Sequence, residues 1–277
     1  MWAGMLVMSA TLLGACAKAP PSIRLATTTS VDNSGLLDVL LPAFTKQTGI
    51  RVDAVAVGSG KALQLARRGD ADMTLTHDPQ IEEVFLSEQR ASLYRKIMYN
   101  DFLIVGAESD PAGAAQAASA TDALRRIAVS TAAFASRGDS SGTDDREKLL
   151  WKRAGATPPR PRLIETGQAM SPTLRVASEK RAYCLTDRAT YAQLEDKLAL
   201  RPLYVGGPEL LNTYAVMVVR RVGSSAEAMA MQLAGWLADG EGRELIAGFK
   251  IKRAAVFTVW PASDPRDTPG ALPRRDP

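Results

Sequence analysis

Residues 23–76 read IRLATTTSVDNSGLLDVLLPAFTKQTGIRVDAVAVGSGKALQLARRGDADMTLT. Apolar residues from Leu37 to Phe44 recur at i, i+3, i+4 and i+7, which is the spacing of one helical face. Short runs rich in apolar and β-branched residues flank the helical stretches, and they predict strands at residues 23–26, 50–57 and 73–76. This alternation is typical of a parallel sheet covered by helices, so the fold class is expected to be α/β.

The remainder of the chain repeats the alternation. Ser119 and Asp122 form the capping pattern of a helix that is expected to end near Arg126. Strands are expected at residues 101–106, 127–129, 182–186 and 214–219, and helices at residues 144–154 and 226–237. A second sheet flanked by helices is therefore expected after the first.

Composition narrows the functional classes. The hydrophobic share of 46% and charged share of 23% are ordinary for a globular protein and exclude a collagen, a coiled coil and a wholly disordered chain. The net charge of +4 is not gathered into a Lys/Arg run, so no nucleic-acid partner is expected. One histidine and two cysteines argue against a zinc enzyme, because such sites take three or four protein ligands. No cofactor and no metal are expected.

The amino terminus is expected to be a targeting segment. Residues 1–15 carry no charged side chain and suit a signal-peptide core. The run ends in Leu13-Gly14-Ala15-Cys16, which resembles a bacterial lipoprotein processing box and implies lipidation of Cys16. A plain signal peptide with an incidental cysteine remains open. Residues 16–22 are expected to form a tether, and the Pro-rich residues 261–277 a disordered tail.

Three turns rich in Gly, Ser and Thr each precede an expected helix, at residues 27–30, 58–60 and 136–143. The first turn of a helix has free backbone N–H groups and the positive end of the helix dipole, and both favour an anion. Open α/β sheets bind ligands at the carboxyl ends of their strands. The three turns are therefore expected to converge on one anion.

The third turn adds a charge. Arg137 places a planar guanidinium, well suited to an oxyanion, beside hydroxyls and backbone amides. Asp139 would repel an anion in direct contact, so its expected role is to hold Arg137 in position. A surface salt bridge beside an ordinary capped helix remains the alternative for this pair.

The same turn fits a nucleophile pattern. Residues 138–142 read G-x-S-x-G and offer Ser140 as a hydrolase nucleophile. That arrangement needs a histidine after the serine, whereas His77, the one histidine, lies before it. A serine hydrolase is therefore a minor alternative, and His77 either lines the cleft or is structural. Cys184 lies in an apolar run and is expected to be buried and inert.

Taken together, residues 23–260 resemble the extracytoplasmic tungstate-binding proteins of ABC importers. The motifs that carry the resemblance are LATTTS at 25–30, SGLLDVL at 34–40, VGSGKAL at 57–63, GDAD at 69–72, MYNDFLIVG at 98–106, SRGD at 136–139, SGT at 141–143, ETGQ at 165–168 and LTDR at 185–188.

The resemblance implies a two-lobed periplasmic-binding-protein-like fold of class II, each lobe a mostly parallel sheet flanked by helices. Lobe one would comprise residues 23–101 and 217–260, and lobe two residues 102–216. A two-segment hinge is expected near 101–105 and 212–216. The function implied is capture, without catalysis, of a tetrahedral oxyanion, most of all tungstate. The implied partners are ABC permease subunits and, through the lipid anchor, the membrane, for a monomer in the periplasm or at an extracytoplasmic membrane face.

The family assigns contacts to the oxyanion that fall here on Thr28, Thr29 and Arg137. Geometry adds Ser59 and Thr143 as weaker candidates. The sequence departs from the tungstate pattern at Ser59, where Thr is common, at Lys61, where Gln is common, and at Asp78, where Ala is often found.

The identity of the anion stays open at this point. The spacing Arg-x-Asp-x-Ser-Gly-Thr also resembles phosphate-binding proteins of the same fold superfamily. Molybdate, phosphate and sulfate therefore remain alternatives to tungstate.

Overall fold

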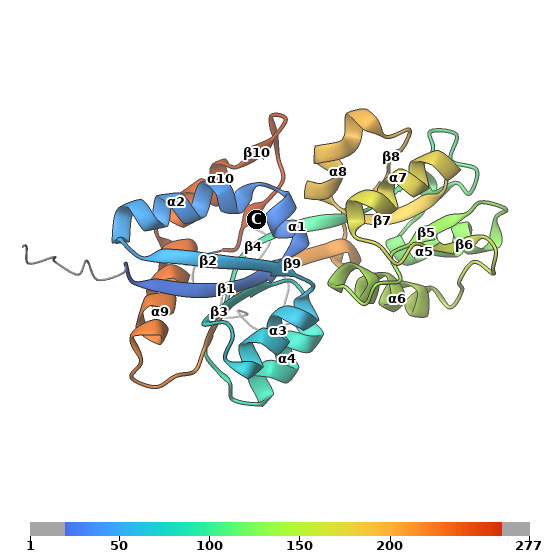
Figure 1. Cartoon of the computed structure of the whole chain (residues 1–277). Helices are drawn as coiled ribbons and strands as arrows, with labels where there is room; N and C mark the ends of the chain where they lie inside the picture. The colour runs from blue at the N-terminus through green and yellow to red at the C-terminus, as the bar shows by residue number, and fades with distance from the viewer. Residues whose placement is uncertain (1–19, 262–277) are drawn as a thin grey trace, which may run out of the picture.

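The computed structural model describes residues 20–261, and the chain forms two lobes joined by two long strands (Figure 1). The expected signal peptide, Cys16 and nearly all of the expected tail lie outside the described residues. The first lobe begins with β1 (Ser22–Thr28), α1 (Thr29–Asn33), α2 (Leu36–Thr48), β2 (Arg51–Val57), α3 (Ser59–Arg68), β3 (Met73–Thr76) and α4 (Pro79–Ser87), and β4 (Ala91–Gly106) then leads into the second lobe.

The second lobe contains η1 (Ala114–Gln116), α5 (Ala120–Val129), β5 (Phe134–Ser136), α6 (Gly142–Ala154), β6 (Leu163–Glu165), α7 (Met170–Lys180), β7 (Tyr183–Asp187), α8 (Arg188–Leu194), η2 (Glu195–Lys197), β8 (Arg201–Val205) and η3 (Pro208–Leu210). The chain returns to the first lobe through β9 (Leu211–Val219), α9 (Ser225–Asp239), α10 (Glu241–Gly248), β10 (Lys250–Ile251), β11 (Ala254–Ala255) and β12 (Thr258–Val259).

Strands run through both lobes in the order β2-β1-β3-β9-β4-β7-β5-β6. In the first lobe β1 is parallel to β2 and β3, while β9 is antiparallel to β3. In the second lobe β5 is parallel to β6 and β7, and β4 is antiparallel to β7. The α/β class is confirmed. The expectation of mostly parallel sheets is corrected to mixed sheets, because β4 and β9, which connect the lobes, run antiparallel to their neighbours.

The strand β4 belongs to both lobes. From Ala91 to Asp101 it pairs with β9, and from Phe102 to Gly106 it pairs with β7 and β8. The pairing of β4 therefore changes lobe between Asp101 and Phe102.

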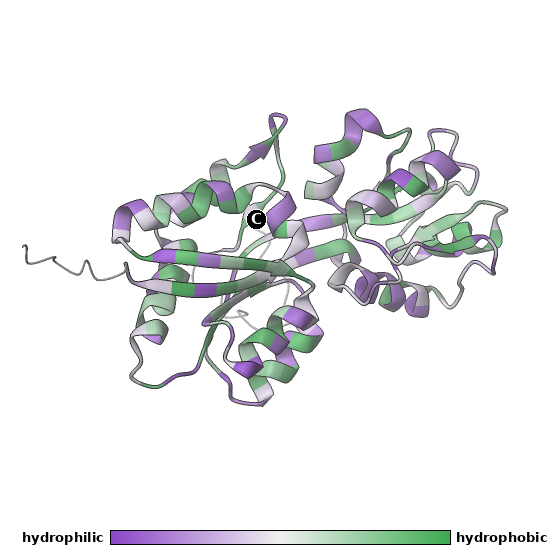
Figure 2. Cartoon of the chain, in the orientation of Figure 1, coloured by the Kyte–Doolittle hydropathy of each residue, from purple (hydrophilic) through white to green (hydrophobic). Residues whose placement is uncertain are grey.

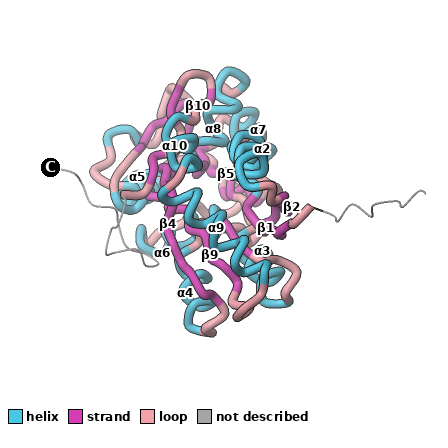
Figure 3. The backbone as a smooth tube through the Cα atoms, turned by 90° about the vertical axis from the view of Figure 1, so that its left-hand side faces the viewer, coloured by secondary structure: helices cyan, strands magenta, loops and turns pink. Residues whose placement is uncertain are grey.

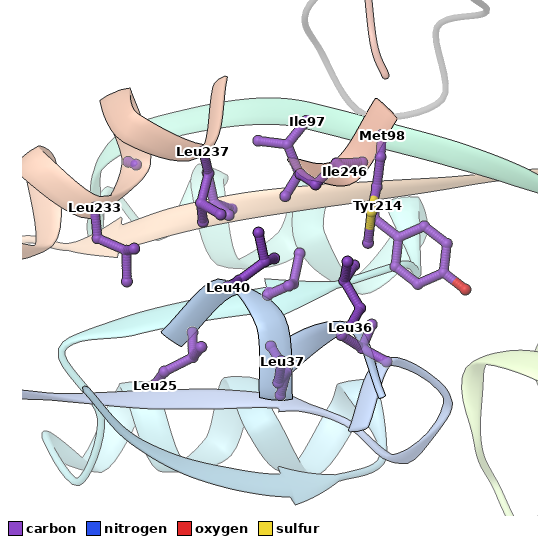
Figure 4. Close-up of a cluster of buried hydrophobic side chains, with 14 of the residues drawn as sticks. Leu25, Leu36, Leu37, Leu40, Ile97, Met98, Tyr214, Leu233, Leu237 and Ile246 are labelled. Carbon is purple, nitrogen blue, oxygen red and sulfur yellow. The ribbon is translucent and has the colours of Figure 1, made fainter. Parts of the chain in front are cut away.

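Each lobe buries its own hydrophobic core, and helices surround the strands when the molecule is viewed from the end of the first lobe (Figure 3). The sheet of the first lobe packs against α2, α9 and α10 on one face and against α3 and α4 on the other. Apolar segments accordingly follow the strands and the inward sides of the helices (Figure 2). Tyr214 closes one end of this core, and its hydroxyl points away from the aliphatic side chains (Figure 4).

Two local predictions are corrected. Residues 127–129, expected as a strand, are the last turn of α5. Ile127 is buried there on the same helical face as Leu124 and Ala123, so its apolar run serves helix packing. The helix α6 starts at Gly142, two residues before its expected start.

Within residues 20–261, no helix is long and apolar enough to cross a membrane.

Candidate anion-binding site

The turns of the first lobe lie side by side because three parallel strands end together. Thr28, the last residue of β1, pairs with Val57, the last residue of β2, and β3 lies on the other side of β1. The chain then continues into Thr29–Ser30, Gly58–Ser59 and His77, respectively. These three segments therefore share one edge of the sheet.

The second lobe repeats this arrangement. The parallel strands β5, β6 and β7 end at Ser136, Glu165 and Asp187. Arg137 follows the central strand of the three, and α6 begins five residues later. The turn that carries Arg137 and Thr143 thus lies at the corresponding edge of the second sheet.

The two edges meet at Gly142, the first residue of α6. A side-chain carbon on Gly142 would lie 3.2 Å from His77 Cε1 and 3.4 Å from Ser59 Oγ. Both neighbours belong to the first lobe. The bare backbone of Gly142 therefore lets the amino terminus of α6 approach the first-lobe turns closely.

Ser59 supplies an unused donor at this meeting point. Its side chain is 1% exposed, and no described residue lies at hydrogen-bonding distance from its hydroxyl. A buried hydroxyl without a partner costs about 1–3 kcal/mol. Gly58, the N-cap of α3, makes no side-chain cap bond, so the first N–H groups of α3 also lack a side-chain cap.

The other predicted contacts lie nearby in the fold. Thr28 is buried, and its Oγ1 lies 3.0 Å from Ser30 Oγ. Thr29 is half-buried and is the first residue of α1, while Thr143 is buried in the first turn of α6. Their contacts with an anion remain predictions.

Arg137 is buried and is held by its own turn. Its Nε lies 3.2 Å from Asp139 Oδ2, and its terminal nitrogen also donates to that oxygen. The other oxygen, Asp139 Oδ1, accepts from Ser141 N at 3.2 Å. The carboxylate of Asp139 thus orients the guanidinium and has both oxygens engaged.

A second carboxylate shapes the turn. Asp144, in the first turn of α6, accepts from Gly138 N at 3.2 Å and from Ser140 N at 2.8 Å. Ser140 has a left-handed backbone with φ of 56°, and Gly138 has φ of 59°. These bonds hold a strained loop beneath Arg137.

His77 lies at the centre of the junction, which the residue pattern alone did not assign. Its Nδ1 is 3.0 Å from Asn212 Oδ1 on β9, and its Nε2 is 3.3 Å from Ser30 Oγ. Burial, together with the charges of Arg146 and Arg137, lowers the pKa of His77 to about 4. The imidazole is therefore neutral at neutral pH.

Arg146 was also missed, because its signal is purely spatial. From α6 its guanidinium donates to the carbonyls of Glu209 and Leu211 at 3.3 Å each. Arg146 thereby ties α6 to the start of β9.

The hydrolase alternative would need His77 as its base. Ser140 is exposed, and both ring nitrogens of His77 lie against Asn212 and Ser30. Cys184 is buried, and burial raises the pKa of its thiol well above the usual range, as expected of an inert cysteine. Among residues 20–261 no cluster of three or more His, Cys, Asp or Glu side chains is arranged to hold a metal ion.

The cleft continues beside this junction as a pocket of about 370 Å³. His77 and Asp78 line it from the first lobe, and Asp145 and Arg146 from α6. Burial raises the pKa of Asp78, and the neighbouring charge of Asp145 adds to the rise.

Comparisons with known proteins identify the family of the chain. Residues 15–241 match the family model described as PBP superfamily domain. The tungstate-binding protein TupA of Peptoclostridium acidaminophilum is 38% identical over 87% of this chain and 86% of its own length.

Two solved structures are similar in sequence and in shape. The tungstate-binding protein TupA of Desulfovibrio alaskensis G20 is 39% identical with a TM-score of 0.78, over 86% of this chain and 98% of that one. The tungstate ABC transporter structure from Geobacter sulfurreducens is 41% identical with a TM-score of 0.74, over 82% of this chain and 98% of that one. The chain therefore belongs to the PBP superfamily and, within it, to the family of ABC-transporter binding proteins that includes the tungstate-binding proteins TupA.

Proposed function

We propose that this protein is the substrate-binding component of an ABC importer and captures tungstate between its two lobes. The observation that carries the proposal is the junction at Gly142, where the amino terminus of α6 faces the partnerless Ser59 hydroxyl of the opposite lobe. Arg137 supplies the one positive charge of the proposed site. Three relatives at about 40% identity bear names that refer to tungstate.

Capture works by replacing water with fixed donors. Burying an anion without partners is prohibitive, so the number of N–H and O–H donors matters more than net charge. The proposed donors are the hydroxyls of Thr28, Thr29, Ser59 and Thr143, the first N–H groups of α3 and α6, and the guanidinium of Arg137. Because the donors come from both lobes, the bound anion favours the closed arrangement over the open one.

Phosphate is the rival that differs from tungstate in its proton. Phosphate keeps a proton at neutral pH and needs a carboxylate oxygen to accept it. Asp139 accepts from Arg137 through one oxygen and from Ser141 N through the other, so a phosphate proton would share an oxygen that is already hydrogen-bonded. Molybdate and sulfate carry no proton and remain the alternatives that a titration separates.

The proposed setting is extracytoplasmic. The protein would be anchored by lipid on Cys16, act as a monomer and deliver the anion to permease subunits. The proposed role is to bind and release the anion without catalysis.

Calorimetric titration with tungstate, molybdate, sulfate and phosphate tests the function. We expect submicromolar tungstate binding, and Arg137→Ala should weaken it by at least ~1.5 kcal/mol, the worth of a hydrogen bond from a charged group. Arg68→Ala is the matched control, since Arg68 is exposed at the far end of α3 and pairs with Asp70. Tight phosphate binding without tungstate binding would show that phosphate is the ligand. Ester hydrolysis that Ser140→Ala abolishes would show that the protein is a hydrolase.

A further inference from the structure

We propose that His77 is a positioning residue that donates from Nε2 to Ser30 in the anion complex, so that the Thr28 hydroxyl hydrogen is left for the anion. The inference rests on the proposed function of the Thr28 turn as part of an anion site. It concerns a residue that touches the hydroxyls and does not itself contact the ligand.

The network begins on β9. Asn212, Asn100 and Tyr214 meet in the core beside the point where β4 changes lobe, and all three are buried. The side-chain amide of Asn212 lies 2.9 Å from Asn100 Oδ1 and 2.9 Å from the Tyr214 hydroxyl. Its other end lies 3.0 Å from His77 Nδ1.

The contacts then lead to the first-lobe turn. His77 Nε2 is 3.3 Å from Ser30 Oγ, which is 3.0 Å from Thr28 Oγ1. Each contact is a hydrogen bond in which either direction of donation fits the distance. The tautomer of His77 therefore fixes the direction of its bond with Ser30, and with it whether Ser30 is able to donate to Thr28.

Two hydrogen arrangements satisfy these contacts. With the hydrogen on Nδ1, His77 donates to Asn212, Ser30 donates to His77, and Thr28 must donate to Ser30. With the hydrogen on Nε2, His77 donates to Ser30, which allows Ser30 to donate to Thr28 and leaves the Thr28 hydrogen free for an anion. Only the second arrangement points the donors toward the anion.

Burial at Asn100 favours the second arrangement as well. When Asn212 donates to Asn100 Oδ1, the amide nitrogen of Asn100 is buried with no partner among the described residues. Since the two ends of an amide have the same shape, hydrogen bonding decides which is which. Turning both amides lets Asn100 donate to Asn212 and Asn212 donate to His77 Nδ1, which places the ring hydrogen on Nε2. A buried oxygen without a partner is then left at Asn100, which is tolerated better than a buried N–H.

The surroundings keep the ring neutral and fixed. His77 packs against Tyr214 with ring centroids 5.0 Å apart and the rings tilted by 39°, and the Phe102 ring lies 6.4 Å away. Arg146 and Arg137 disfavour a second hydrogen on the ring. The ring therefore carries one hydrogen, and its position is the variable that matters.

Because His77 is the one histidine in the chain, nitrogen NMR of ¹⁵N-histidine-labelled protein reports this tautomer without assignment. Calorimetry first establishes whether the unmodified protein binds sodium tungstate; absence of binding counts against the proposed function. With tungstate bound, we expect the ¹⁵N chemical shift of Nε2 to be that of a protonated ring nitrogen. The same signature on Nδ1 in a protein that binds tungstate would overturn the inference alone.

Variants test the same point by affinity. His77→Gln keeps a donor near the Nε2 position, whereas His77→Phe keeps an aromatic ring and removes the donor. We expect the Gln variant to stay within about threefold of the unmodified affinity and the Phe variant to lose at least about tenfold. Equal losses in the two folded variants would mean that His77 only fills space, and circular dichroism checks their folding.

Discussion

Arg137 and Asp139 form a nearly self-contained unit. The two side chains are only 7% and 19% exposed, and they are two residues apart in one turn. A buried guanidinium keeps its orientation only where acceptors bind its N–H groups. Asp139 Oδ2 is such an acceptor, and it binds two of the nitrogens while other N–H groups of Arg137 stay available. The remaining donors of Arg137 are those proposed to reach the anion.

Glu82 plays a different part at the residue scale, beneath the turn that carries His77. Its carboxyl is fully buried, and its Oε1 accepts from Thr76 Oγ1 at 2.7 Å and from Asp78 N at 3.1 Å. Burial raises the pKa of Glu82 to about 7. Glu82 therefore stabilises the turn most when it is protonated.

This shift predicts a pH-dependent stability. Because the folded-state pKa of Glu82 lies above its unfolded value near 4.5, its contribution is full below that value and is lost as pH rises toward 7. Glu82→Gln keeps an oxygen acceptor and removes the charge. Relative to the unmodified protein, the variant should gain up to about 3 kcal/mol in free energy of unfolding between pH 5 and pH 8. Urea unfolding of both proteins at pH 5 and pH 8 measures these free energies. The prediction is contradicted if the difference between variant and unmodified protein is the same at both pH values.

Single residues were predictable where chemistry is local. Asp139 is two residues from Arg137, so a contact between them is visible in the sequence, and the structure contains it. The contacts of His77 were not predictable, since Asn212 lies 135 positions away and Ser30 lies 47 positions away. The anion contacts of Thr28, Thr29, Ser59, Arg137 and Thr143 stay predictions.

At the scale of elements, the start of α6 matters most. Ser141 caps the helix by accepting from Asp144 N at 3.3 Å. The N–H groups of Gly142 and Thr143 do not take part in this cap, and they point out of the amino-terminal end of α6. The first-lobe atoms His77 Cε1 and Ser59 Oγ then lie close to Gly142.

A methyl group on Gly142 should therefore hinder closure. Gly142 lies in the helix and does not need a left-handed backbone, so Gly142→Ala should leave the fold intact. Its Cβ would crowd His77 and Ser59 only when the lobes meet, at a cost of about 1–2 kcal/mol. Tungstate affinity should fall about tenfold by calorimetry.

Gly235→Ala is the matched control for this change, because Gly235 is also helical and has open space around it. Unchanged affinity in Gly142→Ala would show that closure does not bring α6 against the first lobe.

Elements with a strong period were predictable, and short apolar runs were not. The face from Leu37 to Phe44 correctly predicted α2. The prediction for 127–129 was wrong because a short run with β-branched residues fits a strand as well as the buried face of a helix. The Ser119 cap, which accepts from Asp122 N, is the sequence signal that favours the helix.

At the scale of the molecule, the lobes touch at more places than the Gly142 junction. Gln193 of α8 donates to the carbonyl of Ser34 at 3.2 Å, and Lys252 pairs with Asp196. The core of the first lobe also includes Ala189 and Ala192 of α8. The lobes are thus held together on one side by α8 and joined through β4 and β9, which suits closure around a small ligand.

The two-lobed α/β fold followed from the sequence because strand–helix alternation and the family motifs extend over nearly the whole described chain. The approach of α6 to Ser59 did not follow, because it depends on how the lobes sit relative to one another. The central claim is that donors from both lobes surround one oxyanion.

Anomalous scattering from tungsten in a crystal grown with stoichiometric tungstate tests this claim most directly. The account predicts one strong peak, with anion oxygens about 3 Å from the Arg137 guanidinium, the Ser59 hydroxyl and the first N–H groups of α6. A tungsten peak elsewhere, or one that contacts a single lobe, would contradict it.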